Sequence, residues 1–117
     1  MPVTTIVGRL GTKETTIFNE NKRVTNFSIA VNNYVNNEET GDLEKKTHWF
    51  QIEAWDSKSK VIENHISKGQ LIAVRVEILN NLSSSDPKYK GRIKFVTNGI
   101  SFQPEKKTNF TASDIDF

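Results

Sequence analysis

Both tryptophans of the 117-residue chain lie in one short segment, WFQIEAW at residues 49–55. The side chains of a β-strand alternate between two faces, so Trp49 and Trp55 would share a face with Gln51 and Glu53. The opposite face would then be apolar: Phe50, Ile52 and Ala54. Because a carboxylate and an amide are costly to bury without partners, we expect both tryptophans on an accessible surface. Packing under a loop or in a subunit interface would explain the same pattern.

A row of cations with the same period lies later in the chain: Lys88, Lys90, Arg92 and Lys94. In one continuous strand these residues would line one face, and Tyr89 and Phe95 would point to the other. Most charge runs are only solvated surface, but four successive cations without an interleaved acid repel one another. An anionic polymer beside them would relieve that repulsion. Tyr34, at the end of an earlier strand-like segment, would add a third exposed aromatic ring.

Exposed aromatic rings beside a row of cations are typical of surfaces that bind single-stranded nucleic acid. Bases stack on the rings, with roughly 1–3 kcal/mol for each base, and the cations follow the phosphates. Duplex DNA fits this pattern less well, since paired and stacked bases cannot lie flat on an indole ring. A surface that binds another protein through the same tryptophans is the alternative at this point.

Strand-like segments dominate the chain around these residues. They cover residues 3–10, closed by Gly11, a weaker separate segment at 14–18, then 24–34, 47–55, 71–79 and 89–102, where Gly99 predicts a bend. The polar segment NNEETGDLEKK at 36–46 is expected to be a long exposed loop. Alternation predicts inward-facing residues on two of the strands: Phe27, Ile29 and Val31 on one, and Ile72, Val74, Val76 and Ile78 on the other.

One helix is expected between the third and fourth strands. Asp56 or Ser57 would cap its start, Lys68 would lie in its last turn, and Gly69 would follow its end. Its apolar face would contain three residues: Val61, Ile62 and Ile66. Five strands with one helix after the third predict an all-β fold, the five-stranded Greek-key barrel known as the OB-fold. A sandwich is disfavoured because it needs roughly seven strands.

The composition limits the class of protein. A chain of this length predicts one domain, which we place at residues 1–103, followed by a flexible tail at 104–117. The formal net charge is +2, but the last ten residues hold two acids and no base, which leaves a basic body with an acidic tip. No apolar run is long enough to span a membrane, and the N-terminus does not resemble a secretory signal. We therefore expect a cytoplasmic protein.

The sequence offers little support for an enzyme. It contains no phosphate-binding Walker loop, no nucleophile elbow, no cysteine and no cluster of metal-ligand residues, so neither a cofactor nor a metal is expected. The two histidines are far apart in the sequence. His48 should face inward as a structural residue, and His65 should lie on the surface of the helix.

Taken together, these segments resemble the bacterial-type single-stranded DNA-binding proteins, the SSB family. The similar segments, in the family's order and spacing, are VGRLG at 7–11, VTNFSIAVN at 24–32, TGDLEKKTHWFQIEAW at 40–55 and ENHISKGQLIAV at 63–74. The resemblance covers about residues 3–102. It places Trp49 and Trp55 at positions of base-stacking aromatics and Tyr34 near another. It also implies a homotetramer, with a dimer as the alternative, and roles in DNA replication, recombination and repair.

The segment SDIDF at 113–117 resembles the acidic C-terminal tip with which this family recruits replication and repair proteins. Asp114 and Asp116 would meet a basic rim of the partner, while Ile115 and Phe117 would enter a pocket. Asp116 stands where the family's tip has Pro. The preceding linker is shorter than is typical, and the loop at 80–89 lacks the family's Trp, for which Tyr89 would substitute.

Two rival functions remain at the level of sequence. A replication-restart accessory protein of the primosome type would share the fold and bind DNA and protein, but it lacks an acidic tip. An OB module that only binds proteins would use the tryptophan face against a protein surface. Quenching of tryptophan fluorescence by single-stranded DNA separates the last of these from the others.

Overall fold

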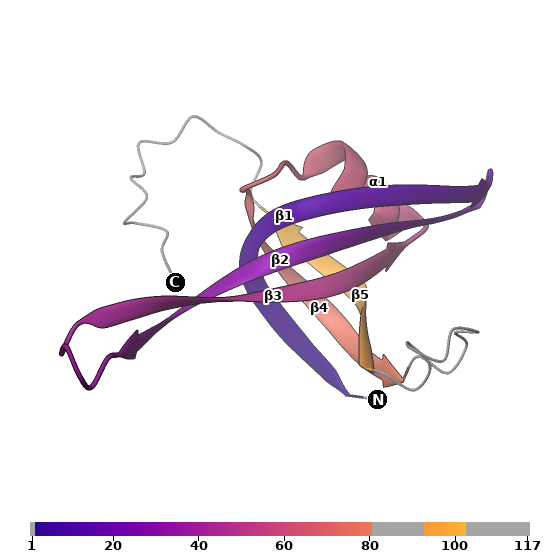
Figure 1. Cartoon of the computed structure of the whole chain (residues 1–117). Coiled ribbons are helices and arrows are strands. Elements are labelled where there is room, and N and C mark those ends of the chain that lie inside the picture. Colours follow the sequence, from indigo (N-terminus) through magenta and orange to yellow (C-terminus); the bar gives the residue numbers. More distant parts are fainter. Residues whose placement is uncertain (1, 81–92, 103–117) are drawn as a thin grey trace.

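The computed structural model describes residues 2–80 and 93–102, and their five strands form one closed barrel (Figure 1). The strands are β1 (Val3–Asn19), β2 (Lys22–Asn36), β3 (Leu43–Trp55), β4 (Leu71–Asn80) and β5 (Ile93–Phe102). Around the barrel the order is β1-β2-β3-β5-β4, with only the β3–β5 pair parallel. The helix α1 (Ser57–His65) lies between β3 and β4 in the chain. This is the predicted OB-fold.

The strand β1 joins the two segments that the sequence separated at Gly11. Its first half pairs with β4, and its second half pairs with β2. The register with β2 shifts between Leu10 and Lys13, so β1 bends there through a bulge. The side chain of Ser28 on β2 accepts the backbone N–H of Thr12 at 2.8 Å, which satisfies a donor that the bulge frees from the ladder.

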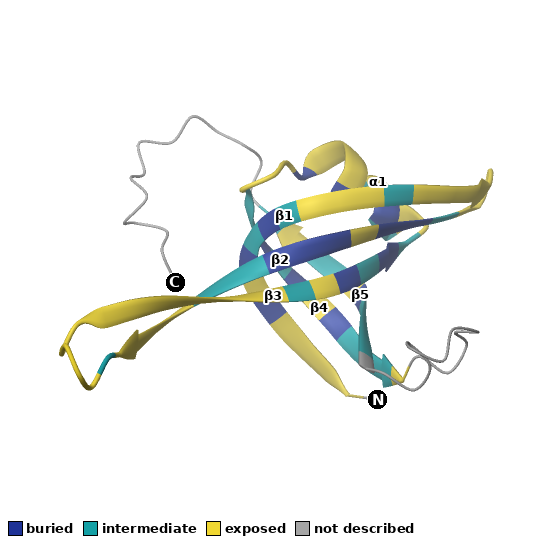
Figure 2. Cartoon of the chain, in the orientation of Figure 1, coloured by how far each residue is buried: buried dark blue, intermediate teal, exposed yellow. Residues whose placement is uncertain are grey.

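The predicted loop at 36–46 is shorter than expected. β2 and β3 continue as a paired ribbon as far as Asn36 and Leu43, and only residues 37–42 form the turn. The outer part of the ribbon extends away from the barrel and is exposed along most of its length (Figure 2). Both faces of this outer part meet solvent, so polar residues are compatible with a strand there. The sequence pattern predicted a loop because a ribbon exposed on both faces has no alternation of apolar and polar residues.

The helix also ends earlier than predicted. Its last residue is His65, and Ile66 already has extended backbone angles, so Lys68 is not in the last turn. The ammonium of Lys13, from the bulge of β1, instead contacts the carbonyl oxygens of Ile62, Glu63 and Ile66 at 3.3, 2.8 and 2.8 Å. A cation from another element therefore stabilises the end of the helix.

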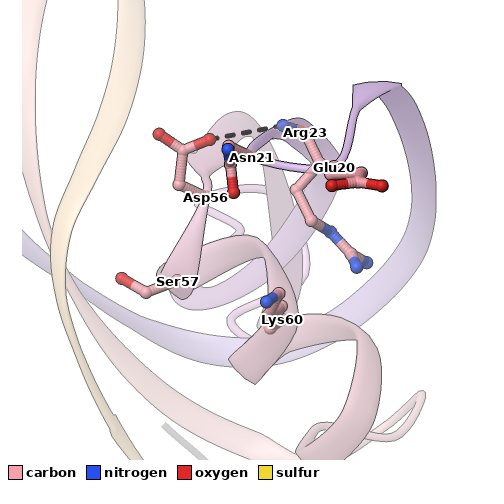
Figure 3. A pocket seen from close by; sticks show the side chains of 6 residues that line it. All are labelled: Glu20, Asn21, Arg23, Asp56, Ser57 and Lys60. Atoms are coloured by element: carbon pink, nitrogen blue, oxygen red, sulfur yellow. Dashed lines mark hydrogen bonds between the residues drawn. The ribbon is translucent and has the colours of Figure 1, made fainter.

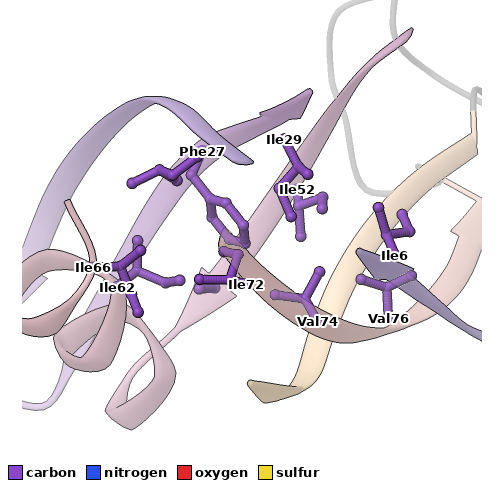
Figure 4. Close-up of a cluster of buried hydrophobic side chains, with 11 residues drawn as sticks. Ile6, Phe27, Ile29, Ile52, Ile62, Ile66, Ile72, Val74 and Val76 are labelled. Atoms are coloured by element: carbon purple, nitrogen blue, oxygen red, sulfur yellow. The ribbon is translucent and has the colours of Figure 1, made fainter. Parts of the chain in front are cut away.

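The barrel core matches the predicted apolar faces. Its buried members come from β1, β2, β3, β4, the helix and the residue that follows the helix (Figure 4): Ile6, Leu10, Phe27, Ile29, Ile52, Ala54, Ile62, Ile66, Ile72, Val74 and Val76. Phe50 and Phe95 are partly buried against this cluster, with their rings edge to face at 5.9 Å. Ile78 is only half-buried, at the end of β4. The irregular pairing of β5 opposite Arg75 confirms the predicted bend near Gly99.

Candidate nucleic-acid interface

The outward-facing side of β1, β2 and β3 carries both tryptophans, and we call it the tryptophan face. Trp49 is 59% exposed, whereas Ile52 and Ala54 on the other side of β3 are buried, as the alternation predicted. Trp55 is half-buried and Gln51 is exposed. The prediction that both tryptophans point away from the core is therefore confirmed.

Trp49 lies on the bulge of β1. A Cβ atom added to Gly11 would stand 2.5 Å from Cζ3 of the Trp49 ring and 2.6 Å from the Ser28 hydroxyl. No side chain larger than hydrogen therefore fits beneath the ring, and the indole is held against backbone. The rest of the large Trp49 surface meets solvent. The ring is therefore supported by the bulge and remains largely accessible from outside.

Trp55 has a different environment, with partners on several sides. Its ring stacks on Phe18 with centroids 6.1 Å apart and an interplanar angle of 11°. Its indole N–H donates to Oε1 of Glu53 at 3.1 Å, and the ammonium of Lys22 lies 5.8 Å from the ring centroid. This last distance is in the range of a cation–π interaction. Trp55 is thus oriented by an aromatic, a carboxylate and a cation.

Tyr34 lies on the same face, further out along the β2–β3 ribbon. In the ladder Ala30 is opposite Trp49, and Tyr34, four residues along β2, is opposite Lys45. Because four residues preserve the face of a strand, Tyr34 points outward with Trp49. Its side chain is 42% exposed. The tryptophan face therefore carries aromatic rings from the β1–β2 hairpin to the ribbon.

Lys94 is the predicted cation that the described residues include. Its ammonium lies 3.8 Å from Oε1 of Glu53, so Lys94 reaches from β5 to the tryptophan face. The same oxygen accepts the indole N–H of Trp55, so one carboxylate connects a cation and an aromatic ring. The other predicted residues of this strand and its loop (Lys88, Tyr89, Lys90 and Arg92) and those of the tip (Asp114, Ile115, Asp116 and Phe117) lie outside the described residues.

Sequence reasoning missed two residues of this face, Phe18 and Lys22. They flank the turn of the β1–β2 hairpin, a segment that reads as a weak strand followed by a polar turn. Only the pairing of three strands brings them to Trp55, so no local pattern marks them. The sequence carried one hint: Phe18 is an aromatic residue next to a polar turn, and no apolar pattern around it explains its presence.

The prediction for His48 was wrong. His48 is exposed although it alternates with Phe50 and Ile52. Pairing between β1 and β2 begins at Arg9 and Ala30, so the ribbon beyond that point has no neighbouring β1 strand to close the core. The alternation continues there without a core to face. His65 is exposed, as predicted, and its ring stacks on Phe102 at 6.2 Å.

A polar hollow separates the β1–β2 turn from the start of α1 (Figure 3). Its lining combines acids, bases and neutral groups: Glu20, Asn21, Arg23, Asp56, Ser57 and Lys60. The backbone N–H of Arg23 donates to the Asp56 carboxylate at 3.3 Å, and the Arg23 guanidinium pairs with Glu63. These contacts connect the β1–β2 hairpin to α1, so the residues around the hollow hold these two elements together.

Within residues 2–80 and 93–102, no group of three or more His, Cys, Asp or Glu side chains has the arrangement of a metal site. Among the same residues, the helix is too short to cross a membrane.

The architecture defines the chain as an OB-fold domain with an aromatic outer face. The chain belongs to the Single-strand binding protein family, whose sequence profile matches residues 1–98. It is similar to single-stranded DNA-binding protein 1 of Nostoc sp., with 34% identity over 74 residues, which cover 62% of this chain and 56% of that protein. The chain thus spans little more than half the length of this relative.

Other relatives match over longer stretches. Single-stranded DNA-binding protein 1 of Synechocystis sp. is 26% identical over 113 residues, which cover 92% of this chain and 88% of that protein. Among solved structures, the Plasmodium falciparum SSB in complex with single-stranded DNA superposes with a TM-score of 0.66 at 21% identity, over 88% of this chain and 95% of that one. PriB from Ralstonia solanacearum superposes with a TM-score of 0.62 at 10% identity, over 87% and 97%. At these identities the structures support the fold alone.

Proposed function

We propose that this protein binds single-stranded DNA without strong sequence preference. The observation that carries the proposal is the exposed Trp49 ring, which lies against the glycine of the β1 bulge and shares its face with Trp55 and Tyr34. Stacking on such rings accepts any base, because every base has a π-face. The family's sequence profile and the named relatives support the same function.

Cations of the same face contact the phosphates in this proposal. Lys94 lies beside Trp55 and Glu53, and the proposal adds Lys88, Lys90 and Arg92 as further phosphate contacts and Tyr89 as a further stacking ring. Phosphate contacts release counterions from the DNA, so the affinity must fall as the salt concentration rises. The expected slope of log K against log salt is about −0.7 for each phosphate contact.

Titration of the protein with oligo-dT tests the proposal. We expect strong quenching of tryptophan fluorescence, reversed by salt, and retardation of the oligonucleotide in a gel. A duplex of the same length serves as the control and should quench much less. A protein that neither quenches nor retards oligo-dT would refute DNA binding and leave the protein-interaction module as the better function.

The acidic segment supplies the second half of the proposal. Residues 1–103 bind DNA, and residues 104–117 recruit replication, recombination and repair proteins through Asp114, Ile115, Asp116 and Phe117. Deleting 114–117 should leave oligo-dT binding intact or slightly stronger, because two acidic side chains are removed. The same deletion should abolish capture of helicase or exonuclease partners. Unchanged capture by the deleted protein would remove the tip from the proposal.

The proposed assembly is a homotetramer, with a dimer as the alternative. The mass of the protein in solution, measured with and without oligo-dT, distinguishes these states and gives the stoichiometry of the complex. A monomer at all concentrations would contradict both.

A further inference from the structure

Phe18 is the residue of the tryptophan face to which neither the sequence patterns nor the family resemblance gave a role. It lies at the end of β1, and its side chain is 57% exposed. A phenylalanine that served only the packing would hide most of its ring, since burial of apolar surface is what stabilises it. Instead the ring is presented outward while it stacks, nearly parallel, on Trp55.

Lys22 lies across the same turn, and within the described residues it forms no salt bridge. It is opposite Asn19 in the hairpin, and its ammonium lies near the Trp55 ring. Within the described part of the chain, no carboxylate lies within 4.0 Å of that ammonium. The next residue, Arg23, differs on this point, because its guanidinium pairs with Glu63 and donates to the Ser59 hydroxyl at 3.1 Å. The fold therefore uses Arg23, whereas Lys22 remains available to an anion.

The hairpin that carries both residues is held in place from its other side. The hydroxyl groups of Thr15 and Thr25 are 2.7 Å apart, and the Thr25 and Ser59 hydroxyls are also 2.7 Å apart. Thr25 and Ser59 are fully buried. This chain of hydroxyl groups ties both strands of the hairpin to α1. A surface fixed in this way loses little conformational entropy when it binds a ligand.

We propose that Phe18 and Lys22 extend the DNA interface past Trp55 to the turn of the β1–β2 hairpin. Phe18 stacks one further base of the strand that runs along Trp49 and Trp55. Lys22 leaves the Trp55 ring and contacts the adjacent phosphate, exchanging a weak cation–π interaction for a charge-assisted contact. This inference rests on the proposed function and adds a stacking position and a phosphate position to it.

Replacing Phe18 with Leu tests the stacking position, because the side chain remains apolar but has no π-face. The affinity of Phe18→Leu for oligo-dT should fall about fivefold or more, the lower end of what one base–aromatic stack contributes. Phe18→Tyr should retain the affinity. The matched control is Ile17→Ala: Ile17 is 65% exposed beside Phe18, but its opposite in the ladder is Arg23, on the helix side of the hairpin. The affinity of Ile17→Ala for oligo-dT should be unchanged.

Replacing Lys22 with Met tests the phosphate position. The salt slope of log K should become shallower by about 0.7, the value of one phosphate contact, while the melting temperature stays near that of the wild type. A direct measurement is photo-crosslinking to oligo-dT that contains 5-iodouracil, followed by mapping of the linked peptide. We expect crosslinks to the peptide that contains Phe18 as well as to those with Trp49 and Trp55.

The outcomes separate this inference from the function on which it rests. If the wild type binds oligo-dT and Phe18→Leu binds equally well, with no crosslink at residues 17–22, the hairpin is outside the interface and only this inference fails. If the wild type does not bind oligo-dT, the proposed function fails and the inference fails with it.

Discussion

Trp49 and Trp55 share one strand and one face but have different environments. Trp49 is mostly exposed and contacts the backbone at Gly11. Trp55 is half-buried, stacks on Phe18 and donates to Glu53. Val24, directly opposite Trp55 in the ladder, is buried although it points outward. We infer that Trp49 serves the ligand alone, whereas Trp55 serves both the ligand and the fold.

The largest effect should come from Trp49→Ala. Loss of a base-stacking ring should weaken oligo-dT binding by roughly 1–3 kcal/mol. Thermal unfolding should change little, because the ring is largely in water already. Fluorescence titration and thermal melts of the same preparation measure both quantities. Normal binding together with a dissociated oligomer would show that Trp49 belongs to a subunit contact.

Trp55→Ala should weaken both oligo-dT binding and the stability of the fold. We expect a loss of roughly 1 kcal/mol in oligo-dT binding, because Phe18 and Lys22 remain on the face. The free energy of unfolding should fall by about 1–3 kcal/mol, since Val24 and Phe18 lose apolar contact. Chemical denaturation gives the second value. If Trp55→Ala binds worse than Trp49→Ala at unchanged stability, the roles of the two rings are the reverse of those inferred.

Gly11→Ala tests whether the close contact with Gly11 positions the Trp49 ring. The added methyl group overlaps the ring and the Ser28 hydroxyl, so the indole must move. Binding of oligo-dT should weaken by roughly 1 kcal/mol, with a shift of the Trp49 emission spectrum. Gly99→Ala is the control, because a Cβ atom added there would lie 3.6 Å from Cβ of Arg75, an ordinary van der Waals contact. Equal affinities of the two variants for oligo-dT would mean that the contact with Gly11 does not position the Trp49 ring.

The smallest effect should come from Lys94→Met, on the Trp55 side of the face. The Lys94 side chain is 27% exposed, and its pair with Glu53 should contribute only about 0–1 kcal/mol to stability. The salt slope of oligo-dT binding should become shallower by about 0.7 if Lys94 contacts a phosphate. Affinities measured at several salt concentrations give this slope. An unchanged slope would assign Lys94 to the fold through Glu53.

Much of the fold follows from local patterns. The alternation in residues 49–55 predicted the direction of both tryptophans, and the buried Ile72, Val74 and Val76 confirm the same reasoning for β4. Where the neighbouring structure decides, local patterns failed. His48 alternates correctly but lies past the edge of the core, and the end of α1 depends on Lys13, far away in the sequence.

The residues of the candidate site also fall into two groups, those that local patterns select and those that they do not. Trp49, Trp55, Tyr34 and Lys94 could be selected from residue type and spacing, whereas Phe18 and Lys22 could not. Alternation along the chain was enough to predict which side of β2, β3 and β4 is apolar, because a period of two is a property of the local backbone. The contacts between rings and cations follow from the assembled barrel, because the register of β1, β2 and β3 sets those distances.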